Sequence, residues 1–224
     1  MDPAALRLSL WLATLTTALL LALGVPLAHW LATSRFRLKF LVEALVALPL
    51  VLPPTVLGFY LLVALAPRAP AGRLWEVIAG HPFPFSFEGL LAASVLYSLP
   101  FAVQPFAAAL AGVDRRLVEA SHTLGASSLA TFVRVVLPLA WPGVLAGAVL
   151  TFAHTLGEFG VVLMVGGNIP GQTRTLSVAI FDHVEALEYG AAHRTAGLLL
   201  AVSFAVLALV YGLQRRPFFR WNGR

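Results

Sequence analysis

Long, unbroken apolar stretches constrain the possible folds of this chain more than any other feature. Crossing the hydrocarbon core of a bilayer takes roughly 20 apolar residues in a helix, because each residue rises about 1.5 Å and the core is about 30 Å thick. Five stretches reach that length: approximately Leu8–Leu31, Phe40–Ala66, Leu90–Ala111, Leu139–Val165 and Thr195–Leu213. Their continuous rather than alternating character favours helices over a closed barrel. The sequence therefore predicts an all-α polytopic membrane protein with about five transmembrane helices.

Composition and loop length leave no room for a separate soluble domain. The chain is 59% hydrophobic and 11% charged, and its mean hydropathy is +0.88. The longest gaps, near Pro67–Gly89, Val113–Pro138 and Gly166–Arg194, are too short to bury a core of their own. We expect one transmembrane domain over residues 1–224, with a retained first helix whose apolar run exceeds that of a signal peptide. Without cysteine, disulfides and thiolate metal sites are excluded.

Basic residues are distributed unequally between the two sets of alternating loops, which predicts the orientation of the chain in the membrane. One set contains ten: Arg35, Arg37, Lys39, Arg115, Arg116, Arg134, Arg215, Arg216, Arg220 and Arg224. The other set contains five: Arg7, Arg68, Arg73, Arg174 and Arg194. The richer side is predicted to be cytoplasmic, which places the N-terminus outside and the C-terminal tail inside. Because the charge is dispersed over membrane flanks, it fits lipid headgroups, with Phe218, Phe219 and Trp221 at the interface, and disfavours nucleic-acid binding.

The loop between the third and fourth apolar stretches, about residues 113–138, predicts two short helices joined at a glycine. Asp114 is placed to cap the first helix, and Gly125 is placed to supply a left-handed turn. The second helix is expected to start at Ser127 or Ser128, with Leu129, Phe132, Val133 and Val136 on one apolar face, and to end or bend at Pro138. By residue pattern alone, an amphipathic connector on the membrane surface and a docking element for a cytoplasmic partner fit equally well.

This loop resembles the coupling-loop signature, the EAA motif, of the permease subunits of bacterial ATP-binding-cassette (ABC) importers. Glu119 and Ala120, Gly125 six residues after the glutamate, and Leu137-Pro138 carry the resemblance, while Ser121 stands where a second alanine is commonest. The resemblance implies that the loop inserts a short helix into a cleft of a cytoplasmic ATPase subunit. The residues expected to couple to that subunit are Glu119, Ala120, Leu124, Gly125, Ala126, Ser127, Leu137 and Pro138.

Three further segments resemble the molybdate branch of this family. They are Leu48–Gly58, Thr155-Leu-Gly-Glu-Phe-Gly160 and Gly167–Leu176, and with the coupling loop the resemblance covers about Leu38 to Thr195. Sulfate permeases share the Leu-Gly-Glu-Phe-Gly segment, and tungstate is nearly the same size as molybdate, so both remain alternatives. The family implies an inner-membrane importer subunit with cytoplasmic ABC ATPase subunits, an extracytoplasmic molybdate-binding protein and a second permease copy as partners.

Polar residues inside a predicted span are candidates for a functional site, because an ionisable group is costly in lipid. His154 and Glu158 are four residues apart and project from one helix face. A carboxylate repels a dianion, so we expect a structural or gating role for His154, Gly157 and Glu158, with Glu158 pairing with His154 or with a polar residue of a neighbouring helix.

Prolines and glycines in the spans predict bends and close helix contacts. Kinks or breaks are expected at Pro26, Pro49, Pro53, Pro54, Pro100 and Pro105, as ordinary irregularities or as a gate. The Gly143 and Gly147 pair predicts close approach of another helix, within the subunit or across a dimer. In the predicted outer loop, Asn168, Gly171 and Thr173 either line an oxyanion-binding pore mouth or form a plain turn.

The sequence disfavours an enzyme. A P-loop requires a lysine followed by Ser or Thr after a glycine-rich stretch, and the sole lysine, Lys39, is flanked by Leu38 and Phe40. The six histidines form no His-Glu-x-x-His pair, and no metal or cofactor is expected. An intramembrane enzyme and a self-sufficient secondary transporter remain the competing classes.

Overall fold

The structure is a computed structural model that describes residues 2–214, and within that range the chain is helical with no strand. Most of the long apolar stretches form long helices, and shorter helices connect them. The elements are α1 (Pro3–Thr33), α2 (Lys39–Val51), α3 (Pro54–Leu65), α4 (Pro70–Ala79), α5 (Phe87–Ala111), α6 (Arg115–Thr123), α7 (Ser128–Thr131), the π-helical turn η1 (Phe132–Val136), α8 (Leu137–Gly157), α9 (Gly160–Gly166), α10 (Leu176–Glu185) and α11 (Tyr189–Gln214).

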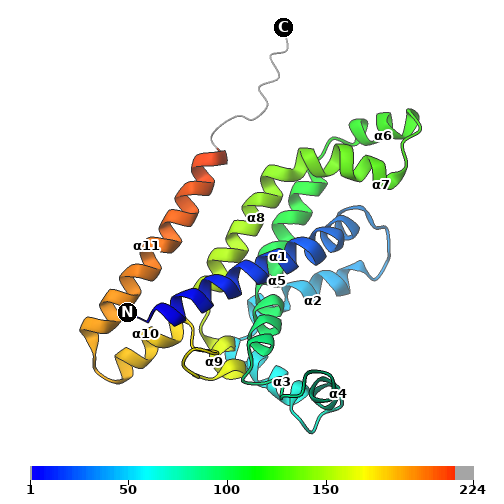
Figure 1. The fold of residues 1–224 in the computed structure, drawn as a ribbon. Coiled ribbons are helices and arrows are strands. Elements are labelled where there is room, and N and C mark those ends of the chain that lie inside the picture. Colours follow the sequence, from blue (N-terminus) through cyan, green and yellow to red (C-terminus); the bar gives the residue numbers. More distant parts are fainter. Residues whose placement is uncertain (1, 215–224) are drawn as a thin grey trace.

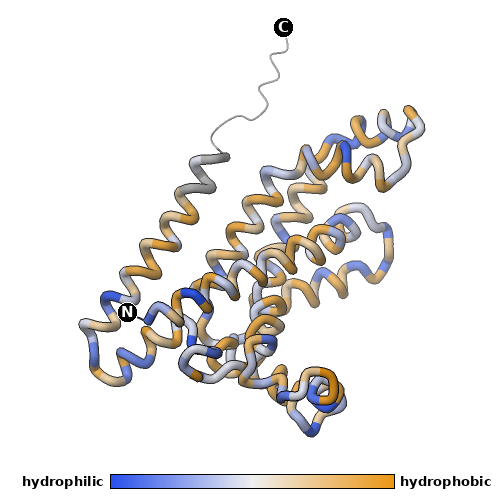
Figure 2. The backbone as a smooth tube through the Cα atoms, viewed as in Figure 1, coloured by the Kyte–Doolittle hydropathy of each residue, from blue (hydrophilic) through white to orange (hydrophobic). Residues whose placement is uncertain are grey.

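Four helices in the described part are long and apolar enough to cross a membrane, and a bent pair brings the number to five if it counts as one span. The four are α1, α5, the continuous helix Ser128–Gly157 and α11. In Figure 1 the α6–α7 hairpin and the far end of α11 lie toward one end of the bundle, and the N-terminus, α4, α9 and α10 lie toward the other. Figure 2 shows the long helices mostly hydrophobic and the hydrophilic residues gathered at their ends.

The predicted second span, Phe40–Ala66, is not one helix. It is divided into α2 and α3, whose axes differ by 114° across the break. The break lies where Pro53 and Pro54 follow Leu52, because the prolines lack N–H donors and the residue before a proline avoids the helical conformation. The other prolines named above, at positions 26, 49, 100 and 105, lie inside helices that continue through them.

The predicted fourth span, Leu139–Val165, is also wrong at its far end. Helix α8 ends at Gly157, Glu158 takes an extended conformation, and the separate short helix α9 begins at Gly160. Its beginning differs as well: of the two outcomes predicted at Pro138, an end of the helix or a passage with a bend into the next span, the helix continues into the span. The π-helical turn η1, in which the Leu137 N–H bonds to the Phe132 carbonyl, joins α7 to α8 without a break and accommodates the proline that follows.

The core lies where α1, α5 and α8 pack together. Phe106 is fully buried among Val103, Val144 and the α1 residues Leu20 and Ala28. The glycine pair acts inside this subunit: a Cβ on Gly147 would lie 2.7 Å from the Phe106 ring, and one on Gly143 would lie 2.5 Å from the Ala109 Cβ. Small residues thus let α5 and α8 approach closely, which is the alternative of a contact within the subunit.

Candidate functional site: the α6–α7 hairpin and the polar groups of α8

The α6–α7 hairpin has the local structure that its sequence predicts. The Asp114 carboxylate accepts a hydrogen bond from the Arg116 N–H at 2.9 Å and caps α6, and the Ser127 hydroxyl accepts one from the Ala130 N–H at 3.3 Å and caps α7. Gly125 has a φ of +83°, which an L-residue rarely adopts. Its N–H bonds to the His122 carbonyl, and the Ala126 N–H bonds to the Ser121 carbonyl. These bonds satisfy the end of α6 and reverse the chain.

The two helices of the hairpin are held together by a pair of hydroxyl groups. Ser121 Oγ and Thr131 Oγ1 are 2.9 Å apart, and Thr131 is buried. Ser121 is the position at which the sequence departs from the alanine of the coupling signature, and the structure gives this serine a specific partner. The hairpin is therefore fastened side chain to side chain as well as through its backbone.

Apolar side chains on the hairpin tip face outward. Leu124 is 88% exposed and Leu129 is 72% exposed, and a Cβ on Gly125 would meet no atom within 4 Å. The predicted single apolar face of the second helix is wrong. Leu129 and Val133 are exposed, whereas Val136 is buried and Phe132 packs inward against the His29 ring at 4.4 Å between centroids. The inward half belongs to the core, and the outward half forms a surface that no described residue covers.

The residues of the predicted coupling site lie in two places, on the hairpin and at the start of α8. Glu119, Ala120, Leu124, Gly125 and Ser127 are exposed on the hairpin, and Ala126 is half-buried beside them. Leu137 and Pro138 lie further along, past the π-helical turn at the start of α8. The structure thus brings the first six together at the tip, and separates the last two from it as the entry into the membrane helix.

In the membrane region, His154 does not bind Glu158. Its Nδ1 lies 3.0 Å from Ser98 Oγ of α5, and that hydroxyl lies 2.9 Å from Thr155 Oγ1. The His154 ring stacks on Phe101 with centroids 3.7 Å apart. This cluster of hydrogen bonds and ring contacts joins the last turn of α8 to α5.

Glu158 is buried, with 5% of its surface exposed, and neither carboxylate oxygen has a hydrogen-bond partner in the described part of the chain. The expected pairing with His154 fails because α8 ends at Gly157, so the helical spacing of four residues no longer holds at Glu158. Its polar neighbour is the hydroxyl of Ser94 on α5, which is also buried and without a hydrogen bond of ordinary geometry. Gly157 is exposed beside it.

Two of the three residues of the predicted outer pore mouth, Asn168 and Thr173, form hydrogen bonds within the protein. Asn168 Nδ2 donates to both oxygens of Asp182 at 2.6 Å, and Arg174 Nε donates to Asn168 Oδ1 at 2.6 Å. Thr173 is fully buried, and its hydroxyl accepts a hydrogen bond from the Ile169 N–H. Both side chains therefore stabilise the loop and are not free to contact an ion.

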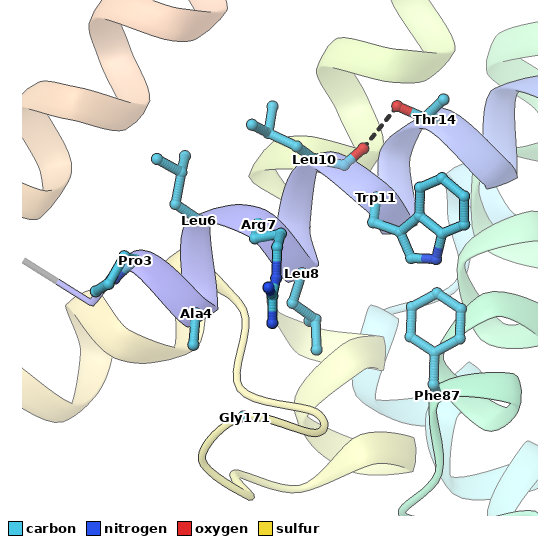
Figure 3. Close-up of a pocket in the computed structure, with 10 residues that line it drawn as sticks. All are labelled: Pro3, Ala4, Leu6, Arg7, Leu8, Leu10, Trp11, Thr14, Phe87 and Gly171. Atoms are coloured by element: carbon cyan, nitrogen blue, oxygen red, sulfur yellow. Dashed lines mark hydrogen bonds between the residues drawn. The ribbon is translucent and has the colours of Figure 1, made fainter.

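Gly171 alone of the three faces open space, at the edge of a cavity of about 690 Å³ along the first half of α1. Arg7, Trp11 and Phe87 are among the residues that line this cavity, and Figure 3 shows the Arg7 side chain pointing from α1 towards the loop that carries Gly171. The sequence reasoning missed Arg7 as a neighbour of this loop, because 164 positions separate it from Gly171.

Known proteins of similar sequence cover almost the whole chain. The family described as "Binding-protein-dependent transport system inner membrane component" matches residues 21–218. The molybdenum transport system permease protein ModB of Azotobacter vinelandii is 56% identical over 96% of this chain and 95% of its own length. The protein of the same name from Escherichia coli strain K12 is 37% identical over 92% and 90%.

Solved structures of the same fold come from other ABC transporters. A chain of the inward-facing MetNI methionine transporter aligns with a TM-score of 0.75 at 18% identity, covering 94% of this chain and 93% of that one. A chain of a bacterial transporter that imports alginate aligns with a TM-score of 0.77 at 15% identity, covering 96% and 79%. With a family match over most of its residues and relatives well above 30% identity, this chain belongs to the family of inner-membrane components of binding-protein-dependent transport systems.

Proposed function

We propose that this chain is the transmembrane permease subunit of an ABC importer that moves molybdate across the inner membrane. The observation that carries the proposal is the 56% identity to a molybdenum transport permease over 96% of the chain. The exposed hairpin tip around Gly125 adds a physical reason for an ATPase partner, because apolar side chains such as Leu124 are presented outside the bundle on a rigid, capped turn. Tungstate is the alternative substrate, with sulfate next and a secondary transporter last.

The hairpin tip is the proposed contact with the ATPase. Leu124 offers an apolar anchor, Gly125 and Ala126 allow close approach, Glu119 offers a charge, and Ala120 and Ser127 complete the exposed turn. Leu137 and Pro138 have a different part in the proposal, which is to pass the movement of the hairpin into α8. ATP hydrolysis then belongs to the partner, since the only lysine of this chain is not in a P-loop.

His154, Gly157 and Glu158 form the proposed gate. They lie at the point where α8 stops and α9 begins, and a helix end is where a span can change direction at small cost. The His154–Ser98 contact anchors one side of this point to α5. Of the outer-loop residues, Gly171 keeps the proposed contact with an entering oxyanion, while Asn168 and Thr173 hold its loop in shape.

The proposed assembly places the hairpin in the cytoplasm, the N-terminus outside, and the C-terminal tail, which lies outside the described residues, in the cytoplasm. The unequal distribution of basic residues supports this orientation. A second permease copy, cytoplasmic ATPase subunits and an extracytoplasmic molybdate-binding protein complete the transporter. Closed two-fold assemblies are the commonest arrangement for identical subunits, which favours a homodimer.

The test is substrate-stimulated ATP hydrolysis by the complex in proteoliposomes. Permease and ATPase are reconstituted together, and the rate is measured with binding protein loaded with molybdate, tungstate or sulfate. We expect stimulation by molybdate, and no ATPase activity from the permease alone. Stimulation by sulfate only would overturn the substrate, and oxyanion flux without any ATPase would overturn the class of transporter.

A further inference from the structure

The geometry points to a cavity between α1, α2 and α5 as part of the route by which the transported oxyanion leaves towards the hairpin side, with the Gln104 amide facing the ion. The cavity has a volume of about 390 Å³. Because liquid water takes about 30 Å³ per molecule, it has room for roughly a dozen waters. The inference rests on the proposed function for the identity of the ion, but not for the location of the route.

The cavity is built from three helices and has apolar walls with a polar rim. Lys39 and Glu43 of α2 and Gln104 of α5 supply the polar groups. The walls come from small or branched apolar residues, which are Leu31, Ala32, Val46, Val103, Ala107, Ala108 and Ala111. The alanines of α5 leave the space open, because a larger side chain at their positions would fill it.

The side-chain amide of Gln104 indicates that the cavity holds water or a polar ligand. It is exposed although it lies inside a membrane-spanning helix, seven residues before the end of α5, or about 10 Å along the axis. Its amide makes no hydrogen bond within residues 2–214. A primary amide facing hydrocarbon would lose its hydrogen bonds to water without replacement. The amide therefore faces water, a hydrogen-bonding ligand or a polar group of the second permease copy, and its N–H groups suit the oxygens of an anion.

The charged residues that line the cavity form an ion pair, and unpaired positive charge lies in the connection between α1 and α2. Lys39 Nζ donates to the Leu31 carbonyl at 2.9 Å and lies 3.3 Å from Glu43 Oε1, so these two charges balance each other in place. Arg35 and Arg37, in the connection before α2, are exposed and form no ion pair with any described residue. The connection that leads into α2 therefore has a net positive charge, which attracts a dianion and repels cations on the side of the chain where Lys39 lines the cavity.

The cavity can be tested by cysteine labelling, because the natural chain contains no cysteine. Gln104→Cys is compared with Leu23→Cys, which replaces a 64% exposed leucine on α1, in the complex reconstituted with its ATPase. The probe is a membrane-impermeant, negatively charged methanethiosulfonate applied from the hairpin side. We expect Gln104→Cys to react at least tenfold faster than Leu23→Cys, and molybdate to slow the reaction. Equal rates, or labelling that no oxyanion slows, would overturn the inference.

A charge substitution tests the same site through transport. Gln104→Glu places a negative charge beside the passing dianion and is expected to slow uptake about tenfold, while Gln104→Asn, which keeps the amide, is expected to retain most of it. Wild-type uptake by Gln104→Glu would overturn the inference. If sulfate protects Gln104→Cys and molybdate does not, the route stands and the proposed substrate fails, so the two failures are distinguishable.

Discussion

The α6–α7 hairpin and the α5–α8 interface place their polar and apolar side chains in opposite ways. On the hairpin the leucines at positions 117, 124 and 129 face outward. Between α5 and α8 the polar residues Ser98, His154 and Thr155 face one another inside the bundle. In lipid, polar groups must find partners within the protein, whereas several exposed leucines on a projecting hairpin mark a candidate interaction surface. The α5–α8 contacts are therefore satisfied within this subunit, and the outward leucines of the hairpin are the surface that we propose for the ATPase.

The largest effect is expected from charging the hairpin tip. Leu124→Asp should weaken association with the ATPase subunit at least 30-fold, because an apolar anchor at the centre of an interface contributes about 2 kcal/mol or more. Leu187→Asp is the matched control, since Leu187 is 71% exposed in the turn between α10 and α11. Affinity is measured by titrating purified ATPase onto permease in detergent. Equal affinities for the two variants would show that the exposed leucines of the hairpin have no special role.

The next largest effect is expected at the tight contact of α5 with α8. Gly147→Val should destabilise the permease by about 2 kcal/mol, because the new side chain overlaps the Phe106 ring. Gly197→Val in α11 is the control, since a Cβ there meets no atom within 4 Å. Thermal unfolding in detergent, followed by circular dichroism, measures the difference. A midpoint as low for Gly197→Val would indicate a general intolerance of valine rather than close packing.

A smaller effect is expected from removing the shared hydroxyl between the same helices. Ser98→Ala leaves His154 Nδ1 and Thr155 Oγ1 without their common partner, and should cost about 1 kcal/mol, as such bonds do inside membrane proteins. Thr17→Val serves as the control, because that hydroxyl bonds only to the Ala13 carbonyl of its own helix. The same unfolding measurement applies. No difference between the variants would mean that packing alone joins α8 to α5.

The smallest effect is expected from removing the hydrogen bond between the Ser121 and Thr131 hydroxyls of the hairpin. Ser121→Ala removes the bond to Thr131 and restores the commonest residue of the coupling signature, so stability should fall by only about 0.5 kcal/mol. A double-mutant cycle with Thr131→Val measures the coupling between the two hydroxyls. Substrate-stimulated ATPase activity should persist in Ser121→Ala. Its complete loss would show that the hydroxyl pair, and not the exposed tip, controls communication with the ATPase.

Much of the hairpin was predictable because its structure is local. Asp114, Gly125 and Ser127 act on backbone groups within five residues of themselves, so the sequence contains both halves of each interaction. The partner of Ser121 was not predicted, and neither was the inward turn of Phe132 onto His29, because each depends on how helices pack. The predicted pairing of Glu158 with His154 is wrong for a related reason, because helical spacing does not hold beyond the residue at which α8 ends. The alternative partner, a polar residue of a neighbouring helix, corresponds to Ser94 of α5.

By itself the sequence determined the class of the protein, the four long apolar helices apart from their exact ends, and the turn chemistry of the hairpin. Hydrophobic length and capping are properties of neighbouring residues. Only the tertiary structure decided that the Pro53–Pro54 break turns the chain by 114°, that the Gly143 and Gly147 pair serves α5, that Asn168 binds Asp182, and that Gln104 faces a cavity. These features join residues far apart in the chain. Their physical cause is the packing of whole helices, which no local pattern specifies.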